Sequence, residues 1–275
     1  MRDDAVIDDA AVVARLRGAG CVFAEEEAAL LLSAARTRQE LDTLVGRRAA
    51  GEPLEQVVGW AEFAGLRIVV DPGVFVPRRR SEFLVSVAVG LAGWRMEGDG
   101  EIPVIVDLCC GTGALGLGVA NGLAGWAELH AADLDPAAVA CARANVEPAG
   151  GRVYVGDLFG ALPSRLRGRA DILICNAPYV PTGDVAFLPA EARDHEPLVA
   201  LDGGLDGLAI LRRAGSDAPP WLAPGGVMLV ETSDQQGPEM AAAMAAAGLS
   251  PSIHTDEDWG ATVVTGRQPG GIAGS

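Results

Sequence analysis

The spacing of apolar residues along the chain changes near residue 100. Before it, apolar side chains recur at the three- and four-residue spacing of amphipathic helices, which predicts three short helices ending near Arg17, Ala35 and Ala50. After it, short aliphatic and β-branched runs alternate with helix-forming segments. We expect strands at 102–108, 127–132, 152–155, 171–176, 226–231, 250–255 and 261–266, and helices at 114–123, 136–146, 204–222 and 235–247. This alternation is typical of a doubly wound α/β sheet with helices on both faces.

A short β-rich stretch joins the helical and the α/β parts. Leu66–Val70 and Val74–Val76 have strand character, the residues 71–73 between them are Asp-Pro-Gly, and a helix follows at 83–92. We therefore predict a helical domain over residues 1–60, a β-hairpin linker over 61–80 and a larger α/β domain over 81–275. The helical domain is either a surface that recognises a substrate or a structural cap on the larger domain.

Composition excludes several kinds of chemistry. The chain of 275 residues has a formal net charge of −16, and all 21 of its basic residues are arginine. The absence of lysine excludes Schiff-base and Walker-A chemistry, and the negative charge disfavours nucleic acid as the main partner. The five cysteines show no metal-ligand spacing, and no apolar run is long enough to span a membrane. We expect a cytoplasmic protein without a metal site.

A glycine-rich turn follows the first strand of the α/β part. Gly111, Gly113 and Gly116 match the spacing of a dinucleotide-binding turn, but that pattern by itself is weak in a chain with 36 glycines. Asp107 ends the preceding strand, where its charge repels a pyrophosphate and suits the ammonium and sulfonium groups of S-adenosylmethionine. We therefore favour S-adenosylmethionine over a nicotinamide dinucleotide as the ligand of this turn.

Acidic residues stand at the ends of the next two strands. Asp133 is placed to accept both hydroxyls of an adenosine ribose, because ligands of such sheets bind at the carboxyl ends of the strands. Asp135 precedes Pro136 and is expected to cap the following helix. Asp157 either accepts from the adenine amino group or is an ordinary turn residue, and Leu158 would pack on the adenine ring.

The fourth strand ends in Asn176-Ala177-Pro178-Tyr179, which carries the expected chemistry. An amide or aromatic-amine nitrogen is a poor nucleophile because its lone pair is delocalised. The side-chain oxygen of Asn176 and the backbone carbonyl of Ala177 can each accept one N–H, which turns the lone pair toward a methyl donor. Pro178 stiffens the loop, and the ring of Tyr179 can stack on a planar acceptor.

These segments resemble the HemK/PrmC family of protein-(glutamine-N5) methyltransferases between about residues 51 and 264. The resemblance rests on Gly51-Glu-Pro-Leu54, Gly59-Trp-Ala-Glu-Phe63, Val76-Pro-Arg78, Ser81-Glu82, residues 107–113, Asp133, Gly156-Asp-Leu158, residues 176–179 and Glu196-Pro-Leu-Val-Ala-Leu-Asp-Gly-Gly-Leu-Asp-Gly207. It implies a class I S-adenosylmethionine-dependent methyltransferase, with a Rossmann-like, seven-stranded mixed sheet, an N-terminal helical domain and a linking β-hairpin.

The resemblance also implies a substrate and a set of site residues. The substrate would be a glutamine in a protein, namely the Gly-Gly-Gln loop of a peptide chain release factor, methylated by a monomeric enzyme. The glutamine would be held by residues 176–179. The S-adenosylmethionine site would be lined by Cys109, Cys110, Gly111, Thr112, Gly113, Asp133, Leu158 and Asn176.

Three departures from the family pattern leave alternatives open. Ala177 replaces the first proline of Asn-Pro-Pro-Tyr, Arg79 and Arg80 stand in a loop that the family fills differently, and residues 256–262 lack the family's usual arginines. The arginines at 78–80 are either a clamp over the ligand or a solvated turn. The alternatives are a methyltransferase for adenine-N6 or guanine-N2 of nucleic acid, and a relative that binds S-adenosylmethionine without turnover.

Overall fold

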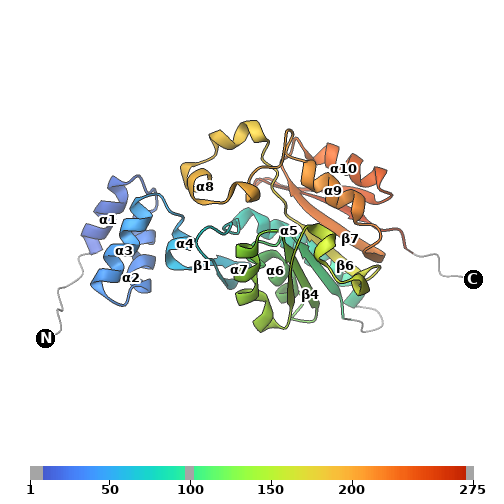
Figure 1. The fold of residues 1–275 in the computed structure, drawn as a ribbon, viewed down its shortest axis with the longest axis horizontal. Coiled ribbons are helices and arrows are strands. Elements are labelled where there is room, and N and C mark those ends of the chain that lie inside the picture. Colours follow the sequence, from blue (N-terminus) through green and yellow to red (C-terminus); the bar gives the residue numbers. More distant parts are fainter. Residues whose placement is uncertain (1–8, 97–101, 271–275) are drawn as a thin grey trace, which may run out of the picture.

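The computed structural model describes residues 9–96 and 102–270, and in it a small helical bundle lies beside a larger α/β body (Figure 1). The bundle consists of α1 (Asp9–Gly18), α2 (Ala24–Ala34) and α3 (Arg38–Ala49), in agreement with the three predicted helices. Leu16, Leu31 and Leu41 are buried between them. The apolar residues at helical spacing therefore form the core of the bundle. The Thr37 side chain caps α3 by accepting from the backbone N–H of Glu40 at 3.1 Å.

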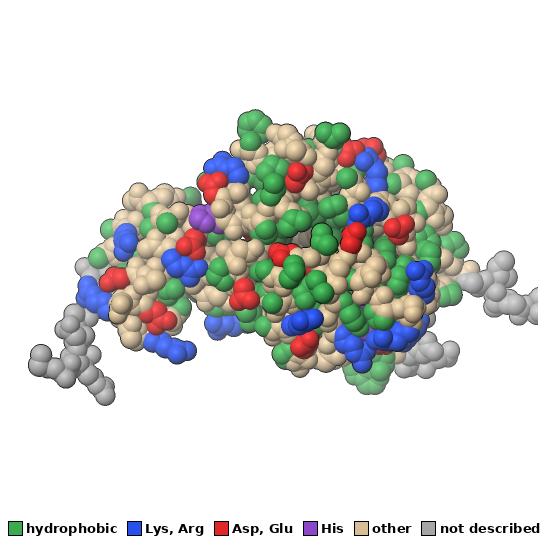
Figure 2. Space-filling model, in the orientation of Figure 1, with side chains coloured by type: hydrophobic (Ala, Val, Ile, Leu, Met, Phe, Trp, Pro, Cys, Tyr) green, Lys and Arg blue, Asp and Glu red, His purple; other side chains and the backbone are tan. Residues whose placement is uncertain are grey.

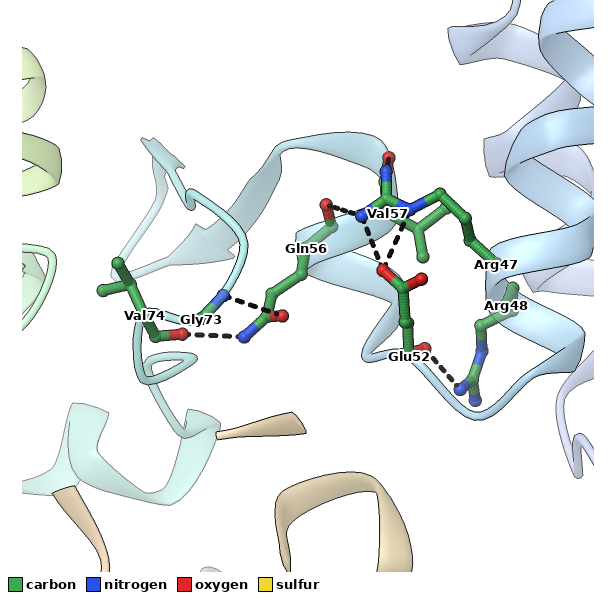
Figure 3. Close-up of polar contacts among 7 residues, drawn as sticks. All are labelled: Arg47, Arg48, Glu52, Gln56, Val57, Gly73 and Val74. Carbon is green, nitrogen blue, oxygen red and sulfur yellow. Dashed lines mark hydrogen bonds and ion pairs between the residues drawn. The ribbon is translucent and has the colours of Figure 1, made fainter. Parts of the chain in front are cut away.

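A short helix that the sequence pattern did not reveal, α4 (Leu54–Val58), fastens the bundle to the body (Figure 3). Arg47 of α3 donates to the carboxylate of Glu52 at 2.9 and 2.6 Å and to the carbonyl of Gln56 at 3.2 Å. The Gln56 side chain donates to the carbonyl of Val74 at 2.9 Å and accepts from the N–H of Gly73 at 3.2 Å. This chain of contacts connects α3 to the segment that follows the hairpin.

The hairpin has different strands from those predicted. β1 (Trp60–Phe63) pairs antiparallel with β2 (Leu66–Val69), whereas the segment 74–76 belongs to no strand. Ala64 and Gly65 form the two-residue connection and both have positive φ, 49° and 72°, which suits the twist of a tight hairpin. The predicted turn at 71–73 exists, since Val74 N–H donates to the Asp71 carbonyl, but extended chain follows it.

The body is built on a seven-stranded mixed sheet in the order β5-β4-β3-β6-β7-β9-β8. The strands are β3 (Val104–Leu108), β4 (Glu128–Asp133), β5 (Arg152–Val155), β6 (Ala170–Cys175), β7 (Leu222–Thr232), β8 (Ser250–Asp256) and β9 (Ala261–Arg267). The first five in this order run parallel, and β9 runs antiparallel to both of its neighbours. The strand order reverses at β3, where α/β sheets of this kind open a crevice. The predicted fold class is confirmed.

Helices cover both faces of the sheet (Figure 1). On one face pack α5 (Glu82–Met96), α6 (Ala114–Gly122) and α7 (Pro136–Val146), and on the other α9 (Ala209–Asp217) and α10 (Gly237–Ala246). Alternate strand residues serve the two layers: Ile172 and Ile174 face α5 and α6, whereas Leu173 faces α9. No helix in residues 9–96 and 102–270 is long and apolar enough to cross a membrane.

The connection between β6 and β7 is more elaborate than the sequence suggests. It contains α8 (Ala190–His195), and the predicted helix at 204–222 begins only at Ala209. Short 3₁₀ turns lie here and elsewhere, at Arg79–Ser81, Glu147–Ala149, Leu158–Ala161, Ser164–Leu166, Thr182–Phe187 and Leu198–Ala200. Gly207 has a φ of 77°, and a Cβ there would lie 2.1 Å from the carbonyl oxygen of Tyr179. The backbones of Gly207 and Tyr179 meet at this point, so the residues before Ala209 form a loop and the helix begins only after it.

Candidate active site

A cavity of about 610 Å³ opens at the carboxyl ends of the parallel strands. Figure 2 shows a hollow near the middle of the face in view, bordered mostly by hydrophobic side chains. All predicted site residues except Asp107 and Gly113 belong to its wall, namely Cys109, Cys110, Gly111, Thr112, Asp133, Asp157, Leu158, Asn176, Ala177, Pro178 and Tyr179. The sheet thus brings together residues from four separate loops.

The loop after β3 forms the floor of the cavity in a strained conformation. Cys109 and Gly111 both have a φ of 54°, and Gly113 N–H donates to the Cys110 carbonyl at 2.7 Å. Gly113 faces away from the cavity, and a Cβ on it would lie 2.6 Å from Val146 of α7. Its φ of 78° and this close packing both favour glycine, and direct contact with a cofactor stays a prediction. A hydrogen bond with Cys175, together with burial, raises the pKa of Cys109 well above its usual value and keeps this thiol neutral.

Asp107 lies behind this loop and is fully buried. Its Oδ2 accepts the N–H of Gly116 at 2.9 Å, and its Oδ1 has no hydrogen-bond partner within the described residues. Burial raises its pKa to about 7; the bond from Gly116 opposes this rise and the charge of Asp133 adds to it. Asp107 therefore holds the loop against α6, and its direct contact with a cofactor also stays a prediction.

Asp133 ends β4 in the cavity wall, and the loops around it are tied to its carboxylate. It accepts the N–H of Gly111 and the N–H of Asp135, each at 2.9 Å. A carboxylate has about four acceptor positions, so two remain for hydroxyl groups of a ligand. Asp135 caps α7 through the N–H of Ala137 at 2.9 Å, as predicted.

Leu158 and Asp157 form the wall after β5. Leu158 is buried with a positive φ of 45°, which presents its side chain to the cavity. Asp157 forms an ion pair with Arg213 of α9, and both residues line the cavity. Asp157 therefore fits both expectations. Its ion pair suits an ordinary turn residue, and its place in the wall suits a contact with the adenine.

Together these residues suit the size and polarity of S-adenosylmethionine. The cavity volume lies in the range of small-molecule sites, and its wall is mostly apolar with a few polar groups. Asp133 offers acceptors for a diol, Leu158 an apolar surface, and Gly111 a bare backbone. In the part of the chain that the structure covers, no His, Cys, Asp or Glu cluster is arranged to hold a metal ion.

The Asn176–Tyr179 loop is held from several sides. The Asn176 side-chain nitrogen donates to the hydroxyl of Ser81 at 3.5 Å, which leaves its oxygen Oδ1 to accept an N–H. The Tyr179 hydroxyl donates to Glu231 at 2.8 Å, and Gln236 donates to the Tyr179 carbonyl at 2.9 Å. Burial and the charge of Glu231 raise the pKa of Tyr179, so its hydroxyl stays protonated. These contacts therefore hold the loop in position without a substrate.

Two further residues belong to the wall: Arg80, expected only as one of the arginines at 78–80, and Glu231, which was not expected. Arg80 lies 3.1 Å from Glu231 and hydrogen-bonds Tyr179. Arg78 pairs with the buried Glu196, whereas Arg79 lies outside the wall. Two of the three arginines therefore line the cavity, and their role as a clamp over the ligand stays a prediction. Glu231 could have been predicted in the same way as Asp133, because it too is an acidic residue near the end of an apolar strand.

Comparison with known proteins gives a consistent pattern. Residues 66–191 match the family model described as methyltransferase small domain. A release factor glutamine methyltransferase of Streptomyces coelicolor is 38% identical, covering 78% of this chain and 71% of its own. A 4-amino-L-phenylalanine/4-methylamino-L-phenylalanine methyltransferase of Streptomyces pristinaespiralis is 36% identical over 70% of this chain and 65% of its own. The hMettl16 catalytic domain shares the fold, with a TM-score of 0.57 at 13% identity over 81% of each chain.

Proposed function

The chain belongs to the HemK/PrmC family of release factor glutamine methyltransferases, and on that premise we propose that it methylates the side-chain nitrogen of the glutamine in a release factor Gly-Gly-Gln loop. It is an S-adenosylmethionine-dependent methyltransferase by family and by fold. The proposal rests mainly on the position of Asn176. It lies in the cavity wall just after β6, and its hydrogen bond to Ser81 orients its side-chain amide.

The chain's own groups align the acceptor nitrogen. Asn176 Oδ1 and the Ala177 carbonyl each accept one N–H of the glutamine amide. This turns the amide so that the nitrogen lone pair, which is perpendicular to the amide plane, points toward the donor. S-adenosylmethionine supplies a methyl group on a positively charged sulfur. The mostly apolar wall limits the access of water during transfer, and the nitrogen releases one proton to solvent afterwards. Alignment of this kind supplies roughly 7–11 kcal/mol of barrier reduction.

Ala177 keeps the part of the loop on which this chemistry depends. Residue 177 acts only through its backbone carbonyl, and alanine has this group just as proline does. The missing restraint of proline on Asn176 is replaced by contacts from elsewhere: Ser81 holds the Asn176 side chain, and Gln236 holds the backbone of Tyr179. The loop remains competent with alanine at this position.

Cofactor contacts are part of the same proposal. We assign the ribose to Asp133, the adenine to Leu158 and Asp157, and the amino-acid part to the loop of Cys109, Cys110, Gly111 and Thr112. Asp107 and Gly113 support that loop from behind. The enzyme is expected to act as a monomer in the cytoplasm, and size-exclusion chromatography with light scattering tests the first of these expectations.

The helical bundle is the expected contact for the rest of the protein substrate. Val22 and Phe23, in the turn between α1 and α2, are 84% and 66% exposed, so this turn presents two adjacent apolar side chains to a partner. Replacing Phe23 by serine should raise KM for a whole release factor and leave KM for a short glutamine peptide unchanged. An equal change for both acceptors would exclude recognition through this turn.

A small aromatic amine is the second candidate acceptor. The relative from Streptomyces pristinaespiralis is named for methylating such amines, and Asn176 and Ala177 suit any nitrogen with two N–H groups. Mass spectrometry after incubation with labelled methyl donor separates the possibilities, with release factor, 4-aminophenylalanine and nucleic acid offered in parallel. Label on a release factor glutamine is expected; label confined to the amine or to nucleic acid would refute the proposal.

A further inference from the structure

Asn176 has a neighbour on the next strand whose role the family assignment leaves open. β6 and β7 pair in parallel with Leu173 opposite Met228 and Ile174 opposite Leu229. Two residues further along each strand, this register places Glu231 beside Asn176. Neighbouring strands are about 4.8 Å apart, and residues in register point to the same face of a parallel sheet. The Glu231 carboxylate thus lies next to the group that receives the substrate nitrogen.

The same 3₁₀ turn, Arg79–Ser81, reaches both residues. Ser81 contacts Asn176 at 3.5 Å, and the adjacent Arg80 contacts Glu231 at 3.1 Å. These contacts independently support the extended register, because two consecutive residues of one turn touch two side chains on neighbouring strands. Asn176, Glu231 and the turn therefore form a single polar corner of the cavity wall.

The negative charge of Glu231 is only partly compensated. Its side chain is 2% exposed, and its Oε1 receives both the Tyr179 hydroxyl and Arg80. Its Oε2 is buried without a hydrogen-bond partner anywhere in residues 9–96 and 102–270. Arg80 is itself 48% exposed, so water screens its positive charge more than it screens the carboxylate. Burial and the charge of Glu231 raise the pKa of Tyr179, and the charge of Arg80 opposes that rise by a smaller amount.

We propose that Glu231 is the residue that selects a neutral amide over a carboxylate in the acceptor position. Its field disfavours an acceptor side chain that carries negative charge, and it favours a nitrogen on which positive charge develops while the methyl group is transferred. This inference rests on the proposed function, in which the acceptor is glutamine. It names Glu231 as a specificity-determining residue that acts through its charge, beyond its hydrogen bond to Tyr179.

The test compares two peptides that differ in one residue. Both carry the Gly-Gly-Gln type loop, and one has glutamate in place of the acceptor glutamine. Affinities are measured by titration calorimetry at pH 8 with saturating S-adenosylhomocysteine, and the readout is the ratio of the two dissociation constants. Because like charges beside each other repel strongly inside a protein, we expect the wild type to bind the glutamine peptide at least about tenfold more tightly.

Four variants separate charge from structure. Glu231→Gln should bring the ratio toward one by improving the affinity for the glutamate peptide, a gain that loss of structure cannot produce. Arg80→Gln, at a half-exposed position, should increase the ratio because it removes the compensating charge. Tyr179→Phe should leave the ratio near the wild-type value. Glu239→Gln removes an exposed carboxylate paired with Arg212 and is the matched control.

The outcomes distinguish this inference from the function on which it rests. A wild type that neither binds nor methylates the glutamine peptide overturns the proposed function and the role of Glu231 with it. A wild type that methylates glutamine, with the same ratio in Glu231→Gln and Arg80→Gln as in the control, overturns the role of Glu231 alone. Opposite changes of the ratio in the two variants support it.

Discussion

Arg48 connects three parts of the molecule, and replacing it by methionine should destabilise the bundle. Its guanidinium group donates to the two carboxylate oxygens of Glu27 at 2.7 and 3.1 Å and to the carbonyl of Glu52 at 2.9 Å, and it lies 3.2 Å from Glu191 of α8. The side chains of Arg48 and Glu27 are each about 10% exposed. Burial by itself would lower the pKa of Arg48, but the two glutamates raise it above its usual value.

The magnitude follows from what the substitution leaves behind. Methionine leaves Glu27 buried without its partner, and breaking a buried pair in this way costs about 3–5 kcal/mol. The contact with Glu191 adds at most about 1 kcal/mol, because that side chain is 42% exposed. Arg48→Met combined with Glu27→Leu should recover most of the loss, since no unpaired charge then remains.

Urea unfolding followed by circular dichroism measures these differences. Arg17→Met is the matched control, because Arg17 pairs with Glu25 at an exposed site where an ion pair contributes about 0–1 kcal/mol. Release of α8 should also change the kinetics of substrate entry, since Glu191 lines the cavity. If Arg48→Met lowers the free energy of unfolding no more than Arg17→Met does, the buried-pair reasoning is refuted.

Three further predictions concern the cavity wall and the buried Asp107 behind it. Asp133→Ala should weaken S-adenosylmethionine binding by about 1–3 kcal/mol in titration calorimetry, and unchanged affinity would remove the ribose assignment. Asn176→Ala should lower kcat for glutamine transfer while much of the cofactor affinity is retained, and an equal loss of both would make cofactor binding the main role of Asn176. Asp107 has a pKa of about 7 in the fold and about 3.9 when unfolded, so the wild type should lose stability as pH rises between these values. Asp107→Asn should lack that slope in urea unfolding at several pH values, and parallel slopes would contradict the burial argument.

Most of the fold and the position of the site follow from the sequence, because they depend on local patterns. Apolar runs at strand spacing locate the strands. The Asp135 side chain caps α7 just before Pro136, so these two residues mark where that helix begins. Polar residues after parallel strands must meet at one edge of a sheet, so the sequence alone predicts that Asp133 and Asn176 share one site, and both line the cavity. The chemistry of the acceptor nitrogen likewise needs only the residue types of the loop at 176–179.

Tertiary structure decided the features that depend on residues far apart in the chain. Arg80 and Glu231 are 151 residues apart, and no spacing rule connects them. The start of α9 depends on Gly207 meeting the backbone of Tyr179, and the register of the hairpin depends on Ala64 and Gly65 rather than on the stronger turn signal at 71–73. Periodicity records which face of an element is buried, whereas these contacts depend on which elements pack together, and that is settled only when the whole chain is folded.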